Sequence, residues 1–206
     1  VLSNADLKTM SAVIRDYGTV GTSLDAGDST YYISQRFCAG VENTRIDCTM
    51  NSGAMQTCTG NNSAFYTELD GDVEGYRMLM AALRLQYTGA PLYAQGQAVV
   101  FKVPDGVNAT AIANNGTLFP SEIGSIVGEV FTFNMQDLEK GVTVFIQPVE
   151  PKASNFGGAQ DNVRDYFEGL AIIMRNLHVD ASITWEFRQV IEYLPHQTTL
   201  LALSAK

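Results

Sequence analysis

The stretch Ile183-Thr-Trp-Glu-Phe-Arg-Gln-Val-Ile-Glu-Tyr-Leu-Pro195 decides the fold. Apolar side chains at 183, 185, 187, 191 and 193 share one parity, and polar side chains at 184, 186, 188 and 192 share the other. A period of two residues is typical of a β-strand with one buried face, and a proline ends such a run. The alternation therefore predicts a strand over 183–193 with Trp185, the only tryptophan, in the core.

Further strands are predicted on both sides of the chain's centre. In Tyr76–Tyr87 the odd-numbered residues from Leu79 to Tyr87 are apolar, which predicts a strand with one buried face. The turn residues Thr88-Gly-Ala-Pro91 separate it from a second strand over Gln97–Val103, and we expect the two to form a hairpin-like unit with a longer loop. Val142–Ile146 alternates in the same way.

The stretch Leu170–Arg175 is apolar on both parities, which predicts a strand buried on both faces. Since only a short connection separates it from the 183–193 strand, we expect these two strands to be neighbours. The segments 31–59 and 128–133 supply two or three more strands. Helical signals are confined to short pieces: a helix over Asp6–Asp16 capped by Ser3 or Asn4, a turn at Pro120–Glu122, and a helix over Asn162–Phe167 capped by Asp161.

These elements predict an all-β fold, an antiparallel β-sandwich. An eight-stranded jelly roll with a few short helices fits best, because no amphipathic helix of 10 to 15 residues separates successive strands as a parallel sheet would require. We expect one domain over residues 1–206, with 1–28 as an N-terminal arm or helix segment and 196–206 as a C-terminal extension. The chain starts with Val1 and lacks a secretory signal, so we expect a processed product or part of a longer one.

Composition narrows the function classes. The 206 residues carry 13 Lys plus Arg against 22 Asp plus Glu, a net charge of −9, which lacks the overall basic footprint of a nucleic-acid-binding chain. With 46% hydrophobic and 17% charged residues the chain is neither disordered nor a membrane protein, and its longest apolar runs fall far short of the roughly 20 residues that span a bilayer. Cys38, Cys48 and Cys58 are expected to be reduced thiols in a reducing compartment, although a local disulfide would be possible if the chain reverses between two of them.

The order of several short motifs resembles a known family. Tyr76-Arg77, Leu83-Arg-Leu-Gln-Tyr-Thr-Gly89 and Gly96-Gln-Ala-Val-Val100 are similar to adjacent strands in the shell domains of nodavirus, tetravirus and tombusvirus-like coat proteins. The later motifs Gly169–Met174 and Ile183–Pro195 resemble the closing strands of the same shells. The resemblance implies a viral jelly roll, in a capsid protein that self-assembles into an icosahedral shell around an RNA genome.

The resemblance also implies partners and a location. The chain would associate with many copies of itself and lie in the virion, after assembly in the host cytoplasm; a host receptor is unknown. Coat proteins of this kind package genomic RNA through a basic N-terminal arm, which this chain lacks, so RNA-binding residues are unknown. Autocleavage of the nodavirus type needs an Asn-Ala or Asn-Phe bond near the C-terminal region, and the bonds of this kind in the sequence lie outside that region, so autocleavage is unsupported. No protruding domain follows Lys206 in this sequence, and we expect that such a domain is either absent from the protein or cut from this chain.

Two acidic groups are candidate metal ligands. Asp70-Gly-Asp-Val-Glu-Gly75 begins like a calcium loop, but the twelfth position is Ala81 rather than glutamate, which excludes an EF-hand. Asp161 and Asp165 form the second group. Asp70, Asp72, Asp161 and Asp165 are thus candidates for a calcium or carboxylate cluster between subunits, with solvated turns and a capped short helix as the alternatives.

The sequence supplies no catalytic residues, and we expect that the protein is not an enzyme. His178 and His196 lie outside every nucleophile or metalloprotease motif. A carbohydrate- or ligand-binding β-sandwich is the alternative function, because a fold alone does not determine function.

Overall fold

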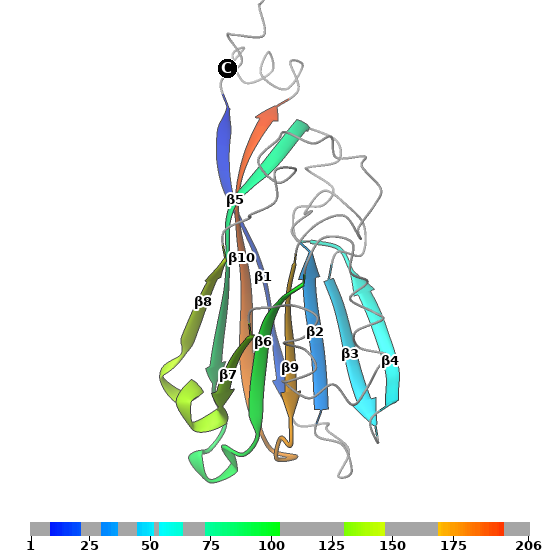
Figure 1. Cartoon of the computed structure of the whole chain (residues 1–206), viewed down its shortest axis with the longest axis vertical. Helices are drawn as coiled ribbons and strands as arrows, with labels where there is room; N and C mark the ends of the chain where they lie inside the picture. Colours follow the sequence, from blue (N-terminus) through cyan, green and yellow to red (C-terminus); the bar gives the residue numbers. More distant parts are fainter. Residues whose placement is uncertain are drawn as a thin grey trace, which may run out of the picture.

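Two antiparallel sheets make up the protein (Figure 1). The computed structural model describes residues 9–21, 30–36, 45–51, 54–63, 73–103, 130–146 and 169–195. The strands of these residues are, in chain order, β1 (Met10–Gly21), β2 (Thr30–Arg36), β3 (Arg45–Asn51), β4 (Ala54–Asn61), β5 (Val73–Tyr87), β6 (Gln97–Val103), β7 (Val130–Asn134), β8 (Val142–Ile146), β9 (Gly169–Arg175) and β10 (Ser182–Pro195). The same residues also contain two short 3-10 helices, η2 (Pro91–Tyr93) and η3 (Met135–Lys140).

The strand pairing defines a jelly roll. Sheet A has the order β1-β10-β5-β8, and sheet B has the order β4-β3-β2-β9-β6-β7. Leaving β3 and β4 aside, the first strand pairs with the last, the second with the second last, and so inward to β6 with β7. The chain is therefore a long hairpin whose two arms wind around one core, as in a double-sheet jelly roll. The predicted all-β antiparallel jelly roll is confirmed, and the β3–β4 hairpin adds two strands to the expected eight.

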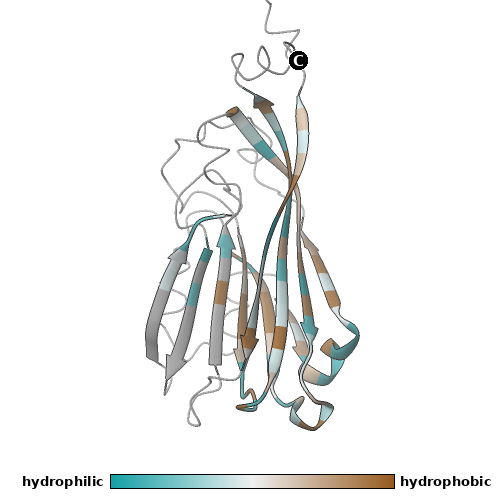
Figure 2. Ribbon diagram, turned by 180° about the vertical axis from the view of Figure 1, so that it is seen from behind, coloured by the Kyte–Doolittle hydropathy of each residue, from teal (hydrophilic) through white to brown (hydrophobic). Residues whose placement is uncertain are grey.

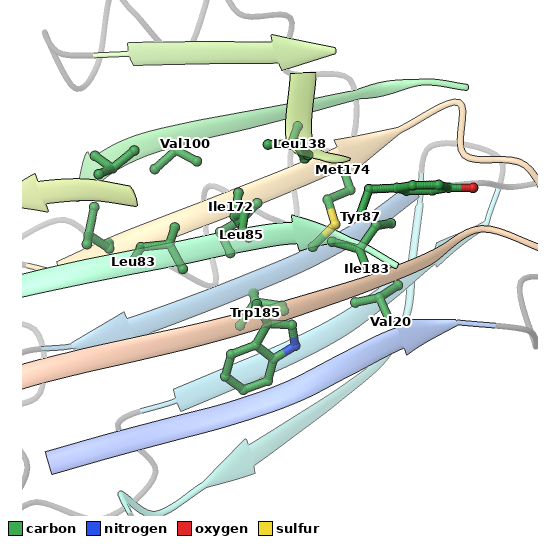
Figure 3. Close-up of a cluster of buried hydrophobic side chains, with 14 of the residues drawn as sticks. Val20, Leu83, Leu85, Tyr87, Val100, Leu138, Ile172, Met174, Ile183 and Trp185 are labelled. Atoms are coloured by element: carbon green, nitrogen blue, oxygen red, sulfur yellow. The ribbon is translucent and has the colours of Figure 1, made fainter. Parts of the chain in front are cut away.

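A hydrophobic core fills the space between the sheets (Figure 3). Leu83, Leu85 and Trp185 reach it from sheet A, and Val100 and Ile172 reach it from sheet B. Trp185 is only 4% exposed, so the parity predicted for the last strand is confirmed. Figure 2 shows the alternation of hydrophilic and hydrophobic residues along the long strands of sheet A. Burial of one face of each sheet is the main source of stability in such a sandwich.

A second, smaller core lies where β1, β5 and β10 extend beyond sheet B (Figure 1). Ile14, Val73, Tyr76 and Ile191 form it. A β-bulge separates it from the main core, because Met78 pairs with Ile191 and Met80 pairs with Val190, leaving Leu79 without a partner. Leu79 was expected on the buried face, but the bulge breaks the alternation and its side chain is 43% exposed.

Strand β9 has the predicted burial but not the predicted neighbour. Its residues from Gly169 to Met174 are all buried, as expected for a central strand. However, β9 pairs with β2 and β6 in sheet B, whereas β10 lies in sheet A. The short connection between the two strands crosses from one sheet to the other, so nearness in sequence does not give hydrogen-bonded neighbours here.

Strands β5 and β6 also lie in different sheets, so the predicted hairpin-like unit is wrong. The connection from β5 to β6 contains η2, and hydrogen bonds attach it to the start of β10, where the connection from β9 ends. The amides of Thr88 and Gly89 donate to the carbonyl of Ser182, and the Tyr87 hydroxyl donates to the carbonyl of Ala90. These bonds direct the chain across the end of the sandwich rather than back along β5.

The predicted helix over Asp6–Asp16 is wrong where the structure describes it, because Met10–Gly21 forms β1, paired with β10 along its whole length. Inward residues Ala12, Ile14 and Val20 alternate with outward ones, but the buried Asp16 interrupts the apolar pattern. Part of the proposed arm at 1–28 is therefore an integral strand. The predicted turn at 120–122 and helix at 162–167 lie outside the described residues, as does the extension at 196–206.

Candidate functional site

The four predicted metal ligands, Asp70, Asp72, Asp161 and Asp165, lie outside the described residues. Within the part of the chain that the structure describes, no group of three or more His, Cys, Asp or Glu side chains could hold a metal ion. The calcium or carboxylate cluster therefore stays a prediction.

The histidine and cysteine predictions fall partly within the structure. His178 stacks on Tyr93 with ring centroids 4.3 Å apart, and its Nδ1 accepts a hydrogen bond from the amide of Asp180. The ring therefore joins the η2 connection to the β9–β10 connection. Among the cysteines, the register of the β3–β4 hairpin sets Cys48 directly opposite Cys58, which is the chain reversal that a local pairing requires. His196 and Cys38 lie outside the described residues.

The outer face of sheet A carries a group of charged side chains that we call the outer arginine face: Arg15, Arg84, Glu186 and Arg188. Strand register brings them together from three strands, because Arg15 is the cross-strand partner of Arg188 and Arg84 is the partner of Glu186. Three guanidinium groups share one carboxylate, which leaves a local surplus of two positive charges in a chain whose net charge is −9.

Glu186 is the centre of the outer arginine face. Arg188 Nη2 donates to Glu186 Oε2 over 2.7 Å, and Arg15 Nε lies 3.9 Å from Glu186 Oε1. The hydrogen bond from Arg188, followed by the charges of the surrounding arginines, lowers the pKa of Glu186. The same hydrogen bond raises the pKa of Arg188. The lowered pKa favours the ionised form of Glu186.

Exposed aromatic rings flank the outer arginine face. Tyr17 on β1 is 78% exposed, and Phe145 on β8 is 64% exposed. In the strand register, Tyr17 lies in the row of Glu186 and Arg84, and Phe145 lies in the row of Arg188 and Arg15. Both rings therefore lie on the outward face of sheet A, at either side of the charged group.

A second polar group, which we call the polar bridge, joins the two sheets and consists of Asp16, Arg45, Asp47, Asn61 and Ser63. Ser63 Oγ donates to Asp16 Oδ2 over 3.1 Å, and Arg45 Nη1 lies 4.0 Å from Asp16 Oδ1. Arg45 Nε also donates to Asp47 Oδ2 over 3.3 Å, and Asn61 Nδ2 donates to the same oxygen. The bridge thus ties β1 of sheet A to β3 and β4 of sheet B.

The polar bridge is partly desolvated. Burial raises the pKa of Asp47, and the charge and hydrogen bond of Arg45 oppose this shift without cancelling it. The second oxygen of Asp47, Oδ1, is buried without a hydrogen-bond partner. The Arg45 guanidinium also lies 5.1 Å from the ring centroid of Trp185, within cation–π range. The bridge is therefore a structural link between the sheets.

Neither the outer arginine face nor the polar bridge could be predicted from the sequence pattern. Arg15, Arg84 and Arg188 are far apart along the chain and belong to three ordinary alternating strands, so only the register reveals their clustering. Tyr17 offered a weak signal, because a large aromatic on the outward parity has no core to enter. Asp16 offered another, since a carboxylate on the inward parity of a strand needs a partner from elsewhere.

Comparison with solved structures finds capsid proteins with a similar fold. The chain matches the BFDV capsid protein, solved as a decamer, with a TM-score of 0.51 and 8% identity over 91% of this chain and 98% of that chain. It also matches a semi-empty virus-like particle of the giant freshwater prawn Macrobrachium rosenbergii nodavirus, with a TM-score of 0.49 and 13% identity over 95% and 88% of the two chains. A mud crab tombus-like virus matches with a TM-score of 0.46 and 12% identity over 98% and 91%.

The likeness to the BFDV capsid protein concerns the fold alone at 8% identity, and the strand order gives the same jelly roll independently. No protein-family model matches the chain, and no curated protein matches it. No helix among the described residues is long and apolar enough to cross a membrane.

Proposed function

We propose that this chain is a viral capsid protein whose jelly roll assembles in many copies into an icosahedral shell around an RNA genome. One observation carries the proposal: the paired-arm jelly roll, with sheets β1-β10-β5-β8 and β2-β9-β6-β7 as its frame, is similar in fold to the BFDV capsid protein. That protein forms decamers, which supports self-association for this chain as well. The role is structural rather than enzymatic.

Surface features of the described residues suit repeated contacts between subunits. Two apolar side chains are exposed at the end of the molecule that holds η2, Leu92 and Val179. A shell subunit can bury such side chains against its neighbours. No observation on the described residues favours the carbohydrate-binding alternative.

The proposal also covers the extent of the domain, the binding partners and the location of the protein. We include one jelly-roll domain over residues 1–206, a virion location, assembly in the host cytoplasm, and genome packaging by a basic arm outside this chain. A calcium or carboxylate cluster at Asp70, Asp72, Asp161 and Asp165 would join neighbouring subunits. The resemblance in strand motifs supports the arm, and the acidic spacing supports the cluster.

Electron microscopy and sedimentation of the purified protein test the proposal. We expect closed spherical particles of uniform size, formed without other proteins. The double variant Leu92→Ser with Val179→Ser removes two exposed apolar side chains and should lower the particle yield, while Thr132→Ser, at an exposed position on β7, serves as the control. A strictly monomeric protein across a range of pH and salt would contradict the proposal.

A further inference from the structure

We propose that the outer arginine face binds single-stranded nucleic acid, with phosphates on Arg15, Arg84 and Arg188 and bases stacked on Tyr17 and Phe145. The inference rests on the proposed function, because it names a surface on which a shell subunit would hold its genome. It differs from that function in its site, since a folded sheet face rather than a separate basic arm would make the contact.

The charge arrangement calls for an anion. Arg15 and Arg188 are direct cross-strand partners, and like charges in that position repel each other. In these two rows of the sheet, Glu186 is the one carboxylate that opposes them. The side chains of Arg15 and Arg188 are 60% and 39% exposed, so an anion in solvent can reach them. A phosphate placed beside the arginines would relieve the repulsion, and guanidinium groups bind phosphate oxygens with paired N–H donors.

The two exposed aromatic rings favour a nucleic acid over other kinds of anion as the ligand. Tyr17 and Phe145 lie on the two outermost strands of sheet A, with the arginines between them. Three strand spacings separate those outer strands, a distance of about 14 Å. Single-stranded nucleic acids bind where a positive surface follows the backbone and exposed aromatic rings stack on the bases, whatever their sequence. A partner that offers only carboxylates, such as an acidic segment of a second copy, would leave both rings without a matching surface.

The binding experiment uses the full chain in unassembled form and a fluorescently labelled oligouridine of about 12 nucleotides, within the site sizes of single-strand-binding surfaces. Three phosphate contacts predict that affinity falls roughly 20-fold between 50 and 200 mM salt. Arg84→Gln should weaken binding and reduce the slope of log affinity against log salt by about 0.7, the value for one phosphate contact on a single strand. Lys140→Gln removes an exposed positive charge on η3 and is the matched control, with an unchanged slope.

A second pair of measurements separates bases from phosphates. Tyr17→Ser should lower the affinity for oligouridine by about five-fold or more, because one base loses its stacking partner. The same variant should bind inorganic polyphosphate as the parent does, since that polymer has no bases. Urea denaturation of each variant checks that its fold is intact.

Three results would overturn the inference. The first is an absence of salt-dependent binding by the parent protein, and the second is equal behaviour of Arg84→Gln and Lys140→Gln. The third is that Arg84→Gln changes only the sedimentation of particles formed without nucleic acid, which would assign the face to a second copy. A protein that forms closed particles but does not bind oligouridine when unassembled would contradict this inference alone, whereas binding by a protein that never forms particles would contradict the proposed function alone.

Discussion

At the scale of single residues, Trp185 depends on contacts from three strands. Its ring lies against Gly18 of the neighbouring β1, it packs at a tilt on Phe187 of its own strand, and it lies beneath the Arg45 guanidinium from the opposite sheet. A Cβ atom at position 18 would lie 2.5 Å from Trp185 Cζ2. Glycine is therefore needed at position 18 for its small size, since it makes room for the indole ring.

Gly18→Ala should lower the free energy of unfolding by about 1–3 kcal/mol, the usual effect of overpacking a core. The added methyl group would collide with the rigid indole ring rather than with a flexible side chain. Urea denaturation measures the change, and Thr19→Ala, on the outward face of the same strand, should have a much smaller effect. Equal stability of Gly18→Ala and the parent would show that the ring lies elsewhere.

Asp47 provides a pH-dependent prediction. Burial raises its pKa in the folded protein above the ordinary value of 3.8. The folded state therefore holds this proton to a higher pH than the unfolded state, so the stability contributed by Asp47 is present at low pH and is lost as the pH rises through the raised pKa. Asp47→Asn cannot titrate, and its free energy of unfolding should rise relative to the parent as the pH rises from the ordinary value of 3.8 through the raised pKa.

Urea denaturation of Asp47→Asn and the parent at a series of pH values gives that difference. Asp180→Asn, at an exposed position in the β9–β10 connection, is the control. A difference between Asp47→Asn and the parent that shrinks as the pH rises would mean that Arg45 outweighs burial at this carboxylate.

At the scale of elements, alternation predicted strands wherever the inward residues were uniformly apolar. Val142–Ile146 and Ile183–Pro195 are strands as predicted, and β9 is buried on both faces. The prediction was wrong for β1, because a buried aspartate on its inward parity hid the alternation and early polar residues suggested a helix cap. Strand partners could not be predicted from spacing, since each connection that crosses between the sheets separates sequence neighbours.

Gly96, at the start of β6, should be the most sensitive glycine of the connection that carries η2. Its φ of +97° is strained for other residues, and an added Cβ would lie 2.7 Å from the Asn176 carbonyl oxygen. Gly141 also has a positive φ, of +75°, but only ordinary contacts surround it. We therefore expect Gly141→Ala to cost about 1 kcal/mol in the free energy of unfolding and Gly96→Ala at least 2 kcal/mol more.

Thermal and urea denaturation of the two alanine variants, side by side, measure these costs. Because both glycines have a positive φ, the difference between the two variants reports mainly the close approach of the β9–β10 connection to Gly96. Equal costs for the two variants would mean that this connection can move away.

At the scale of the whole molecule, the fold class could be predicted from the sequence, but the outer arginine face could not. The net charge of −9 is a sum over the whole chain and does not show where charges lie. The strand register brings three arginines together on one surface, and that local positive charge is not visible in the sum. The predicted site residues came instead from local acidic spacing at Asp70, Asp72, Asp161 and Asp165, which lie outside the described residues. Local spacing detects sites built within one loop, whereas a sheet builds its surfaces from distant segments.

The acidic residues lead to a prediction on whole particles. If carboxylates of neighbouring subunits share protons or calcium, a chelator combined with a rise to about pH 8 should make particles swell, because the ionised groups then repel. Light scattering measures the particle radius. Replacing Asp70 and Asp72 by asparagine should reduce the swelling, and Glu139→Gln, at an exposed position on η3, is the control. An unchanged radius on chelation would show that these carboxylates are solvated loop residues.

The pairing of β1 with β10 also affects how the protein is made. Residues 10–21 find their partners only at 182–193, so a chain growing at about 5–20 residues per second leaves β1 without that partner for roughly 10–40 s. Pairing over such a separation is also intrinsically slow. Val13 and Tyr17 stay exposed on an unpaired edge during that time, which creates a risk of aggregation. Nascent chains would therefore benefit from a chaperone, and products truncated before β10 would be unable to complete sheet A and would be excluded from any assembly that depends on it.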